Sequence, residues 1–289
     1  MKDFYIDFHT HSHLSDGSLS PQQLLDRAKA AGIRILAITD HNRIYSDLPR
    51  LQAQNPELQL VHGCEISCLA PITGDKETEL HVVALNFDPS SPALQKVLKQ
   101  NQPDRRPYIE AILQRLRECN IILEDYDTLQ KQFPETTHFG RMNIAATMVK
   151  KGYVSSVNEA FDLYIGAHGE RRAFVPNPLR YVSMEEAVSA IRSAGGIPVL
   201  AHLFYYLLQE QENHKLLDCF RCLAGAESAM EVNYGPYDAA QRSALKELAA
   251  KYGLMGSAAS DFHGQNPEDR LDHHFPATEH LPLLECLGF

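Results

Sequence analysis

Short runs of apolar residues alternate with amphipathic segments along most of the chain. Residues 4–8 form the first apolar run, and the helical pattern after it begins with Ser20 and Pro21 and ends before Gly32. The next run, residues 35–39, is apolar almost throughout, which is typical of a parallel strand covered on both faces. Further strands are predicted at residues 58–66, 80–87, 197–201, 229–233 and 254–259. This alternation predicts an α/β fold.

The alternation stops between about residues 101 and 180, where apolar positions mark helical faces with no convincing strand between them. It resumes at Ser183, the first residue of a capping box that opens a helix running to Gly195. We therefore expect a discontinuous domain, residues 1–100 and 181–289, whose strands complete one sheet or barrel. Residues 101–180 are expected to form an inserted, mainly helical subdomain that caps the substrate.

The composition is that of an ordinary globular protein, since 44% of the 289 residues are hydrophobic and 22% are charged. The formal charge is −10 and no block of Lys or Arg occurs, so duplex nucleic acid is not an expected partner. No apolar stretch reaches the roughly 18–20 residues that span a bilayer, and the N-terminus does not resemble a signal peptide. We expect a cytoplasmic protein without a membrane partner. The six cysteines include one CxxC pair, Cys219 and Cys222, for which reduced thiols are favoured over a zinc site.

Histidines and acidic residues gather where the predicted strands end. His9 and His11 stand two residues apart, so their side chains leave the same face of the first strand. Asp16 follows in a Ser-Asp-Gly loop that can turn back over the same strand end. Comparable positions on the other strands carry His41, Glu65, His81, His202, Asp261 and His263. Of these, His81 fits least well, because it precedes its apolar run.

The carboxyl ends of parallel strands meet at one face of a barrel, so these nine side chains are expected to lie together. Six imidazoles and three carboxylates exceed the needs of one ion, and Glu65 can bridge two ions through its two oxygens. We therefore expect two or three divalent ions, and this donor set suits manganese, zinc or iron(II). Such a centre lowers the pKa of bound water and stabilises both oxygens of an in-line displacement, which favours hydrolysis of a phosphate ester.

The order of the motifs is more specific than any one of them. They are Phe8-His9-Thr10-His11-Ser12 with Ser15-Asp16-Gly17, then Thr39-Asp40-His41, Glu65-Ile66-Ser67, His81-Val82-Val83-Ala84-Leu85, Ala201-His202 and Ser260-Asp261-Phe262-His263. In this order they resemble the motifs of the polymerase-and-histidinol-phosphatase (PHP) family, across residues 4–264. The resemblance is closest to the stand-alone phosphoesterases of that family, which carry an inserted domain.

The resemblance implies a distorted (β/α)7 barrel of the PHP type and a trinuclear metal centre, in which a hydroxide bridging two ions attacks phosphorus. It assigns His9, His11, Glu65 and Asp261 to one ion, Glu65, His81 and His202 to a second, and Asp16, His41 and His263 to a third. A catalytic role is expected for five of these ligands, namely Asp16, His41, Glu65, His202 and Asp261.

Two segments of the insertion also resemble parts of related phosphoesterases that face the metals. They are Thr137-His138-Phe139-Gly140-Arg141, and Ala173-Phe174-Val175-Pro176 preceded by Arg171 and Arg172. The resemblance implies that His138, Arg141, Arg171 and Arg172 bind substrate, and a guanidinium fork suits a phosphate. The alternatives are that the arginines coat a helical surface and that His138 caps a helix.

Three residues beside the expected ligands have open roles. Asp40, next to His41, is expected to orient an imidazole of the cluster. Tyr205 and Tyr206 follow the Ala-His pair, where members of the family often have Pro-Gly. Their rings either contact the base or leaving group of a substrate or pack in the core.

We expect a metal-dependent phosphoesterase that hydrolyses a small organic phosphate of the nucleotide type: a nucleoside monophosphate, a 3′,5′-bisphosphate, a cyclic phosphate or an oligoribonucleotide end. One alternative is a metal-dependent hydrolase of a C–N or C–O bond, which has no need of Arg141, Arg171 or Arg172. A second alternative is a metal-stabilised regulatory module without turnover. The complete set of nine ligands argues against the second alternative, because loss of turnover does not require keeping them all.

Overall fold

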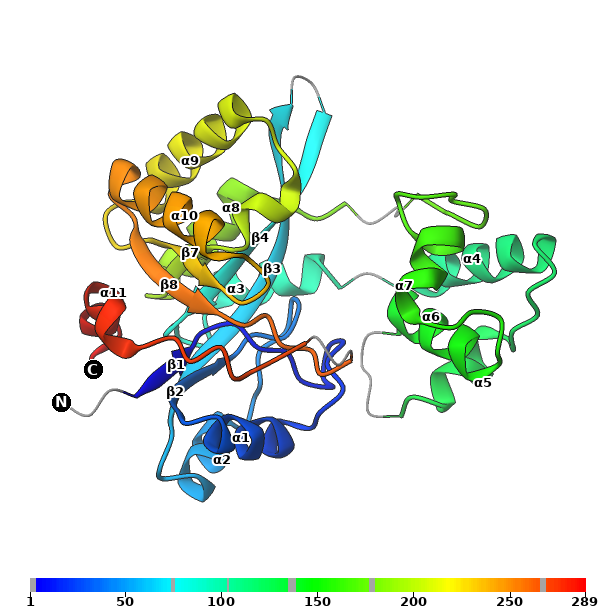
Figure 1. Ribbon diagram of the computed structural model, residues 1–289, viewed down its shortest axis with the longest axis horizontal. Coiled ribbons are helices and arrows are strands. Elements are labelled where there is room, and N and C mark those ends of the chain that lie inside the picture. Colours follow the sequence, from blue (N-terminus) through cyan, green and yellow to red (C-terminus); the bar gives the residue numbers. More distant parts are fainter. Residues whose placement is uncertain (1–3, 74–75, 103, 135–138, 177–179, 266–268) are drawn as a thin grey trace. The chain divides into compact units, whose positions relative to one another are not determined.

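The computed structural model describes residues 4–73, 76–102, 104–134, 139–176, 180–265 and 269–289. The chain divides into two compact units, residues 1–101 with 181–289, and residues 102–180. Within its described residues, the first unit contains one eight-stranded sheet with helices around it (Figure 1). The protein therefore has the α/β fold that the alternating pattern predicts.

The sheet of the first unit is a nearly closed, distorted barrel. Its strands are β1 (Tyr5–Asp7), β2 (Ile33–Ile38), β3 (Gln59–Thr73), β4 (Lys76–Leu85), β5 (Val182–Ser183), β6 (Ile197–Leu200), β7 (Ala229–Tyr234) and β8 (Met255–Ala259). Seven of them follow the order β1-β2-β3-β4-β6-β7-β8, while the two-residue β5, which the apolar pattern does not predict, pairs with β3. The ends of the sheet meet, since Phe8 N donates to the carbonyl of Ala258 and Asp261 N to that of His9, each at 2.9 Å.

Strand β4 runs antiparallel to both of its neighbours, β3 and β6, whereas the β1–β2, β2–β3, β6–β7 and β7–β8 pairs are parallel. The residues that precede the apolar run of β4 therefore lie at the same end of the barrel as the carboxyl ends of the parallel strands. The poor fit expected for His81 was wrong, because it assumed a parallel strand. On the side of His81 that points away from the barrel, β3 and β4 extend as a two-stranded arm (Figure 1).

Helices pack against both faces of this sheet, the last helix of the chain against the inner face and the others against the outer face. They are α1 (Pro21–Ala30), α2 (Leu48–Gln54), α3 (Pro92–Gln100), α8 (Met184–Ser193), α9 (Glu210–Ala224), α10 (Ala239–Tyr252) and α11 (Leu281–Leu287). Their ends follow local signals in the sequence, as predicted. Ser20 caps α1 and Ser183 caps α8, each in a capping box, and α10 ends at Gly253, whose φ of 63° lies in the left-handed region.

Alternate residues of the strands face two different apolar clusters. In β2, Ile35 and Ala37 pack with residues of β1, β4, β6 and α11. Leu36 and Ile38 instead pack against α1, beside Leu24 and Leu25. Because β2 is covered on both faces, its sequence is apolar almost throughout, and its carboxyl end is held rigidly where His41 follows it.

The described part of the second unit is helical. Its elements are α4 (Arg106–Glu118), α5 (Tyr126–Lys131), α6 (Arg141–Lys150), α7 (Val157–Ala160) and the π-helical turn Phe161–Ile165. Apolar side chains at helical spacing, such as Ile109, Leu113, Ile144 and Met148, give this unit a core of its own. In neither unit do the described residues include a helix with the length and apolar character needed to cross a membrane.

Candidate metal centre

All nine predicted ligands lie in the first unit, where the structure brings them together at one end of the barrel. His9, His11, Glu65 and His202 are buried and form the floor of the site. Asp16, His41, His81, Asp261 and His263 are partly exposed and form its rim. Seven of the nine come from segments that follow β1, β2, β6 and β8, and the other two from within β3 and β4.

Glu65 occupies the centre of the cluster, with a side chain that is only 1% exposed. Its Oε2 atom lies 3.3 Å from His9 Nε2, 3.4 Å from His11 Nε2 and 2.9 Å from His41 Nδ1. Its Oε1 atom lies 2.8 Å from His81 Nδ1 and 3.1 Å from His202 Nε2. Five imidazoles thus face the two oxygens of one carboxylate, which is the arrangement expected of a bridging ligand.

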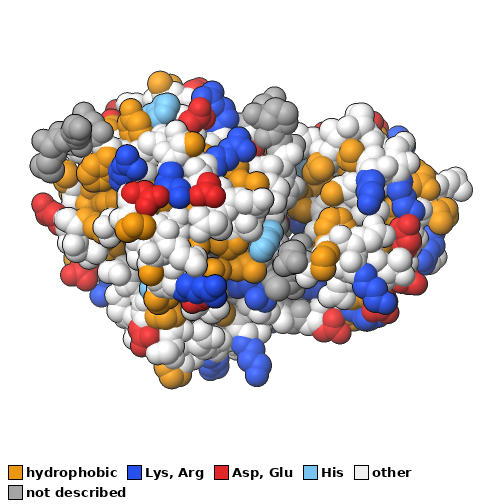
Figure 2. Space-filling view, turned by 90° about the horizontal axis from the view of Figure 1, so that it is seen from below, with side chains coloured by type: hydrophobic (Ala, Val, Ile, Leu, Met, Phe, Trp, Pro, Cys, Tyr) orange, Lys and Arg blue, Asp and Glu red, His pale blue; other side chains and the backbone are white. Residues whose placement is uncertain are grey.

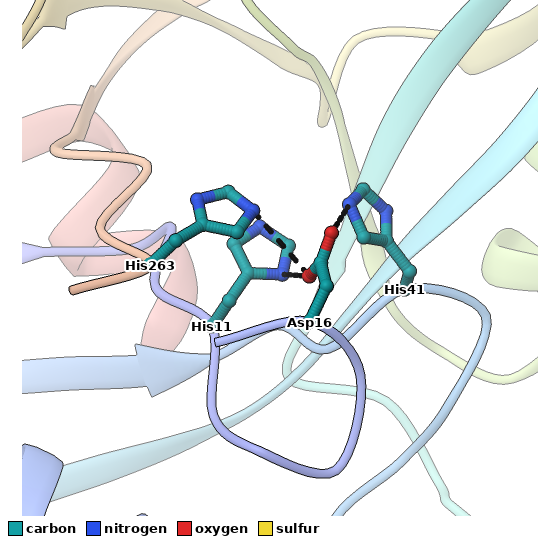
Figure 3. Close-up of side chains that lie close together, drawn as sticks. All are labelled: His11, Asp16, His41 and His263. Atoms are coloured by element: carbon teal, nitrogen blue, oxygen red, sulfur yellow. Dashed lines mark ion pairs between the residues drawn. The ribbon is translucent and has the colours of Figure 1, made fainter. Parts of the chain in front are cut away.

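Asp16 reaches into a second part of the cluster from the loop after β1 (Figure 3). Its Oδ1 atom lies 3.7 Å from His11 Nδ1 and 3.4 Å from His263 Nε2, and its Oδ2 atom lies 3.5 Å from His41 Nε2. The loop passes so close to the preceding strand end that a Cβ atom on Gly17 would collide with the carbonyl of His11. Glycine after Asp16 is therefore required for this carboxylate to face the imidazoles.

Asp261 completes the group around His9 and His11. Its Oδ1 atom lies 3.4 Å from His9 Nε2 and 3.1 Å from His11 Nε2. Its Oδ2 atom accepts a hydrogen bond of 2.7 Å from the hydroxyl of Tyr234, a residue that the sequence analysis missed. The hydroxyl orients the carboxylate, leaving the other oxygen directed at the two histidines.

Asp40 was expected to orient an imidazole, but among the described residues its carboxylate bonds to none and instead holds the loop that carries Asp16. Its buried carboxylate accepts hydrogen bonds from Ser12 N at 2.8 Å, Ser12 Oγ at 2.7 Å and Ser15 Oγ at 2.7 Å. The expectation failed because the side chains of adjacent residues leave the backbone in different directions. Asp40 thus acts on the site by holding Ser12 and Ser15 in the loop that leads to Asp16.

Burial disfavours the charged forms of these side chains, but the opposite charges around them outweigh it in several cases. The pKa of Glu65 lies well below its usual range, because the charge of His9 and of other imidazoles outweighs the effect of burial. In His263, burial is likewise overcome by the charge of Asp16, which raises the pKa to about 10. Burial together with neighbouring imidazoles lowers the pKa of His11 to about 3. The cluster therefore combines ionised carboxylates with both charged and neutral imidazoles.

Two central oxygens of the cluster show that the residues fit divalent ions. Among the described residues, Glu65 Oε2 and Asp16 Oδ1 are buried and accept no hydrogen bond, although ring nitrogens approach each of them. An ionised oxygen without a donor is costly in a protein interior, and a cation removes this cost. Three overlapping groups have ligand atoms close enough to hold an ion: His11, Asp16, His41 and His263; His9, His11 and Asp261; and His41, Glu65 and His81.

Glu231 is a buried carboxylate beside the floor that the sequence analysis did not single out. It lies in β7, and its Oε1 atom is 2.6 Å from His9 Nδ1. Its Oε2 atom accepts a hydrogen bond of 2.7 Å from His202 N. The available signal was a charged residue in the middle of a mainly apolar strand, where an ionisable side chain needs a partner.

The expected substrate-binding residues belong to the second unit, and His138 lies outside the described residues. Arg141 packs over the ring of Phe161, with 5.8 Å between its Cζ atom and the ring centroid, and Arg171 packs over Phe174 at 4.2 Å. Neither is paired with a carboxylate in the part of the chain that the structure describes. Arg172, by contrast, forms an ion pair with Glu170.

Tyr205 and Tyr206 differ in their surroundings. The hydroxyl of Tyr206 accepts a hydrogen bond from His81 N at 2.9 Å and donates one to the carbonyl of Ala201 at 3.0 Å, so this residue ties β4 to β6. Tyr205 is 70% exposed, and its ring centroid lies 5.3 Å from that of His202. Tyr206 therefore has a structural role, while the ring of Tyr205 is accessible beside the cluster.

Comparison with known proteins agrees with this geometry. A family model described as the PHP domain matches residues 7–175. The chain is 32% identical to a 5′-3′ exoribonuclease of Haemophilus influenzae over 89% of each protein. It is 29% identical to a 3′,5′-nucleoside bisphosphate phosphatase of Chromobacterium violaceum, over 96% of this chain and 93% of that protein.

The fold agrees as well. A crystal structure of a candidate metal-dependent phosphoesterase from Bifidobacterium adolescentis superposes with a TM-score of 0.80 and 25% identity, over 98% of this chain and 96% of that one. The sequence relatives and the structural neighbour thus both indicate a phosphoesterase, and each matches nearly the whole length of this chain. The chain belongs to the PHP family and is a metal-dependent phosphoesterase.

Proposed function

We propose that this protein hydrolyses phosphate esters of the nucleotide type, with the nine clustered residues as ligands of two or three divalent ions. The observation that carries the proposal is the buried carboxylate of Glu65, whose two oxygens face five imidazoles and include one without a hydrogen-bond donor. That arrangement is suited to cations and has no evident structural purpose without them.

The ligand set divides into two parts with different tasks. The three floor histidines, with Asp261 and His81, lie around Glu65, and together with it they would hold two neighbouring ions. Asp16, His41 and His263 would hold a third ion at the rim. When bound, ions in such a centre lower the pKa of water and neutralise the oxygens of a phosphoryl group. The histidines and carboxylates fix these charges in place before substrate binds, so little reorganisation is needed during the reaction.

A phosphate ester also needs cationic side chains from the protein. Residues 102–180 carry eleven Lys and Arg against ten Asp and Glu, whereas the remainder of the chain carries sixteen against twenty-seven. On the visible face of each unit in Figure 2, basic side chains are interspersed with acidic ones. We therefore assign phosphate binding to individual arginines, Arg141 and Arg171 first, because no carboxylate neutralises either among the described residues.

The relatives narrow the class of substrate. One is named for cleavage of RNA from the 5′ end and another for removal of phosphate from a nucleoside 3′,5′-bisphosphate. Both substrates contain a nucleotide phosphate ester. We propose a substrate of the same kind for this chain, either a bisphosphorylated nucleoside or the 5′ end of a short RNA.

A panel assay tests the proposal. Purified protein loaded with Mn²⁺ is incubated with a nucleoside 3′,5′-bisphosphate, a nucleoside monophosphate, a cyclic phosphate, a 5′-phosphorylated oligoribonucleotide and histidinol phosphate, and released phosphate and nucleotide are measured. We expect turnover of a ribonucleotide substrate that stops after chelation and falls by several orders of magnitude in His9→Ala. Metal-dependent stability without turnover of any substrate would favour the regulatory module.

The arginines separate phosphate chemistry from the hydrolysis of a C–N or C–O bond. Arg141→Ala and Arg171→Ala are expected to raise KM for the best substrate by about tenfold or more, since each removes a charge-assisted contact. Arg115→Ala is a suitable control, because this exposed residue of α4 already pairs with Glu118. Unchanged kinetics in both test variants would support the C–N or C–O alternative.

A further inference from the structure

Glu231 contacts two of the nine ligand residues without belonging to the set. Its side chain is 1% exposed, and each of its oxygens has a separate partner. Oε1 lies 2.6 Å from the Nδ1 atom of His9, which follows β1, while Oε2 accepts the backbone N–H of His202, which follows β6. One carboxylate in β7 therefore joins ligand residues from two other strands.

The contact with His9 decides which ring nitrogen carries the proton. An ionised carboxylate has no hydrogen to donate, so a hydrogen bond to it requires a proton on Nδ1. When the ring is neutral, which is the form that binds a cation, the other nitrogen, Nε2, then keeps its lone pair. This atom faces the cluster, 3.3 Å from Glu65 Oε2 and 3.4 Å from Asp261 Oδ1. The lone pair is thus directed to the place where an ion would sit.

The contact with His202 holds an unusual backbone conformation. His202 has φ 27° and ψ 56°, in the left-handed region that residues other than glycine seldom adopt. Its N–H donates to Glu231, and its carbonyl accepts a hydrogen bond of 3.0 Å from the hydroxyl of Tyr237. The turn is therefore fixed on both sides, which keeps His202 Nε2 3.1 Å from Glu65 Oε1.

We propose that Glu231 is a positioning residue of the metal centre. Its carboxylate sets the tautomer of His9 and holds the backbone of His202, and so it prepares one nitrogen donor for each oxygen of Glu65. The inference rests on the proposed function only in that the cluster binds metal. It concerns metal affinity, and it holds whichever phosphate ester the enzyme hydrolyses.

Glu231→Gln tests this role with almost no change of shape. A glutamine side chain has one oxygen and one NH₂ group, so it cannot accept from His9 Nδ1–H and His202 N–H with separate oxygens. If its oxygen keeps the N–H of His202, its NH₂ group faces His9 Nδ1, and the proton of His9 moves to Nε2. We expect the affinity of the full-length protein for Zn²⁺ to fall about 10–100-fold, the range typical of residues that orient metal ligands.

Asp7→Asn controls for the loss of a buried negative charge. Asp7 is also 1% exposed, and its Oδ1 atom accepts the backbone N–H groups of His9 and Ser260, at 3.2 and 3.0 Å. Because burial raises the pKa of Asp7 to about 7, both variants are compared at about pH 8.5, where this carboxyl is ionised. Asparagine retains Oδ1, so only the charge is removed and the ring of His9 is untouched. The control is expected to change Zn²⁺ affinity less than threefold. An equal loss in both variants would mean that charge alone explains the effect, and would overturn the proposal.

Zn²⁺ affinity is measured by competition with a chromophoric chelator, and imidazole tautomers by ¹⁵N NMR of the Zn²⁺-loaded protein, with His9 assigned from His9→Asn. In the wild-type protein we expect a proton on His9 Nδ1. A proton on Nε2 instead would refute the assignment even if Glu231→Gln failed to fold. Neither measurement uses turnover, so a protein that binds Zn²⁺ as described but hydrolyses none of the phosphate esters contradicts the proposed function alone.

Discussion

Replacing Asp40 by alanine removes the acceptor for three hydrogen bonds that hold the loop after β1. The donors are Ser12 N, Ser12 Oγ and Ser15 Oγ, at 2.7–2.8 Å. Hydrogen bonds to a charged group contribute about 1.5–3 kcal/mol each, which gives a simple sum of about 4.5–9 kcal/mol. The true loss is smaller, because the three share one carboxylate whose burial is itself costly and raises the pKa of Asp40. We expect Asp40→Ala to lower the free energy of unfolding by about 3–5 kcal/mol.

Asp40→Asn separates charge from shape. The amide keeps one acceptor oxygen, and its NH₂ group can donate to a serine hydroxyl that rotates to accept, so we expect a loss of about 1 kcal/mol. The assay is urea denaturation of the metal-free protein, in which Asp40→Ala should lower the midpoint at an unchanged m-value. Asp47→Asn is the control: Asp47 is an exposed helix N-cap without a side-chain hydrogen bond, and the change should stay within about 0.5 kcal/mol. A loss below about 1 kcal/mol for Asp40→Ala would show that the three bonds do not hold the loop.

Three further results are expected. Gly17→Ala should displace Asp16 and remove one ion from the metal stoichiometry measured by elemental analysis, because its Cβ collides with the carbonyl of His11; an unchanged metal content would contradict this. Mn²⁺ affinity should rise with pH between 6 and 8.5, since the pKa of His263 is about 10 without metal and binding must release its proton; a flat chelator titration would rule this out. Asn101→Ala should cost about 2–4 kcal/mol in urea denaturation, because Val182 N loses a buried acceptor at 3.0 Å, whereas a loss within 0.5 kcal/mol would deny Asn101 a structural role.

Much of the first unit could be predicted because its signals are local. Ser20 with Pro21 begins a helix, and Gly253 ends one, for reasons contained in a few neighbouring residues. The ligand set was also predictable, because the carboxyl ends of parallel strands converge whatever their exact register. His9, His41 and His202 needed only a strand before them to be placed correctly.

The direction of β4 was not predictable from the apolar pattern. A strand has the same pattern of alternating faces in either direction, and the connection from β3 is a hairpin rather than a helix. His81 therefore looked displaced, although it pairs with Ser67 in register and faces Glu65. The partners of Asp40 lie 25 and 28 residues away in sequence, and nothing near residue 40 indicates them.

Glu231 shows most clearly what the sequence alone cannot predict, because its partners follow two other strands of the barrel. Sequence patterns identify groups that bind an ion by their chemical type and by their place at strand ends. A residue that orients those groups is defined only by where its oxygens lie relative to a ring nitrogen and a backbone N–H, and many residue types can fill that place. That Glu231 has a partner can be inferred without the structure. Burying a carboxylate in a strand costs so much free energy that some partner had to be present. A charged residue inside a mainly apolar strand that runs toward a predicted metal centre therefore indicates a second layer of the site, even before its partners are known.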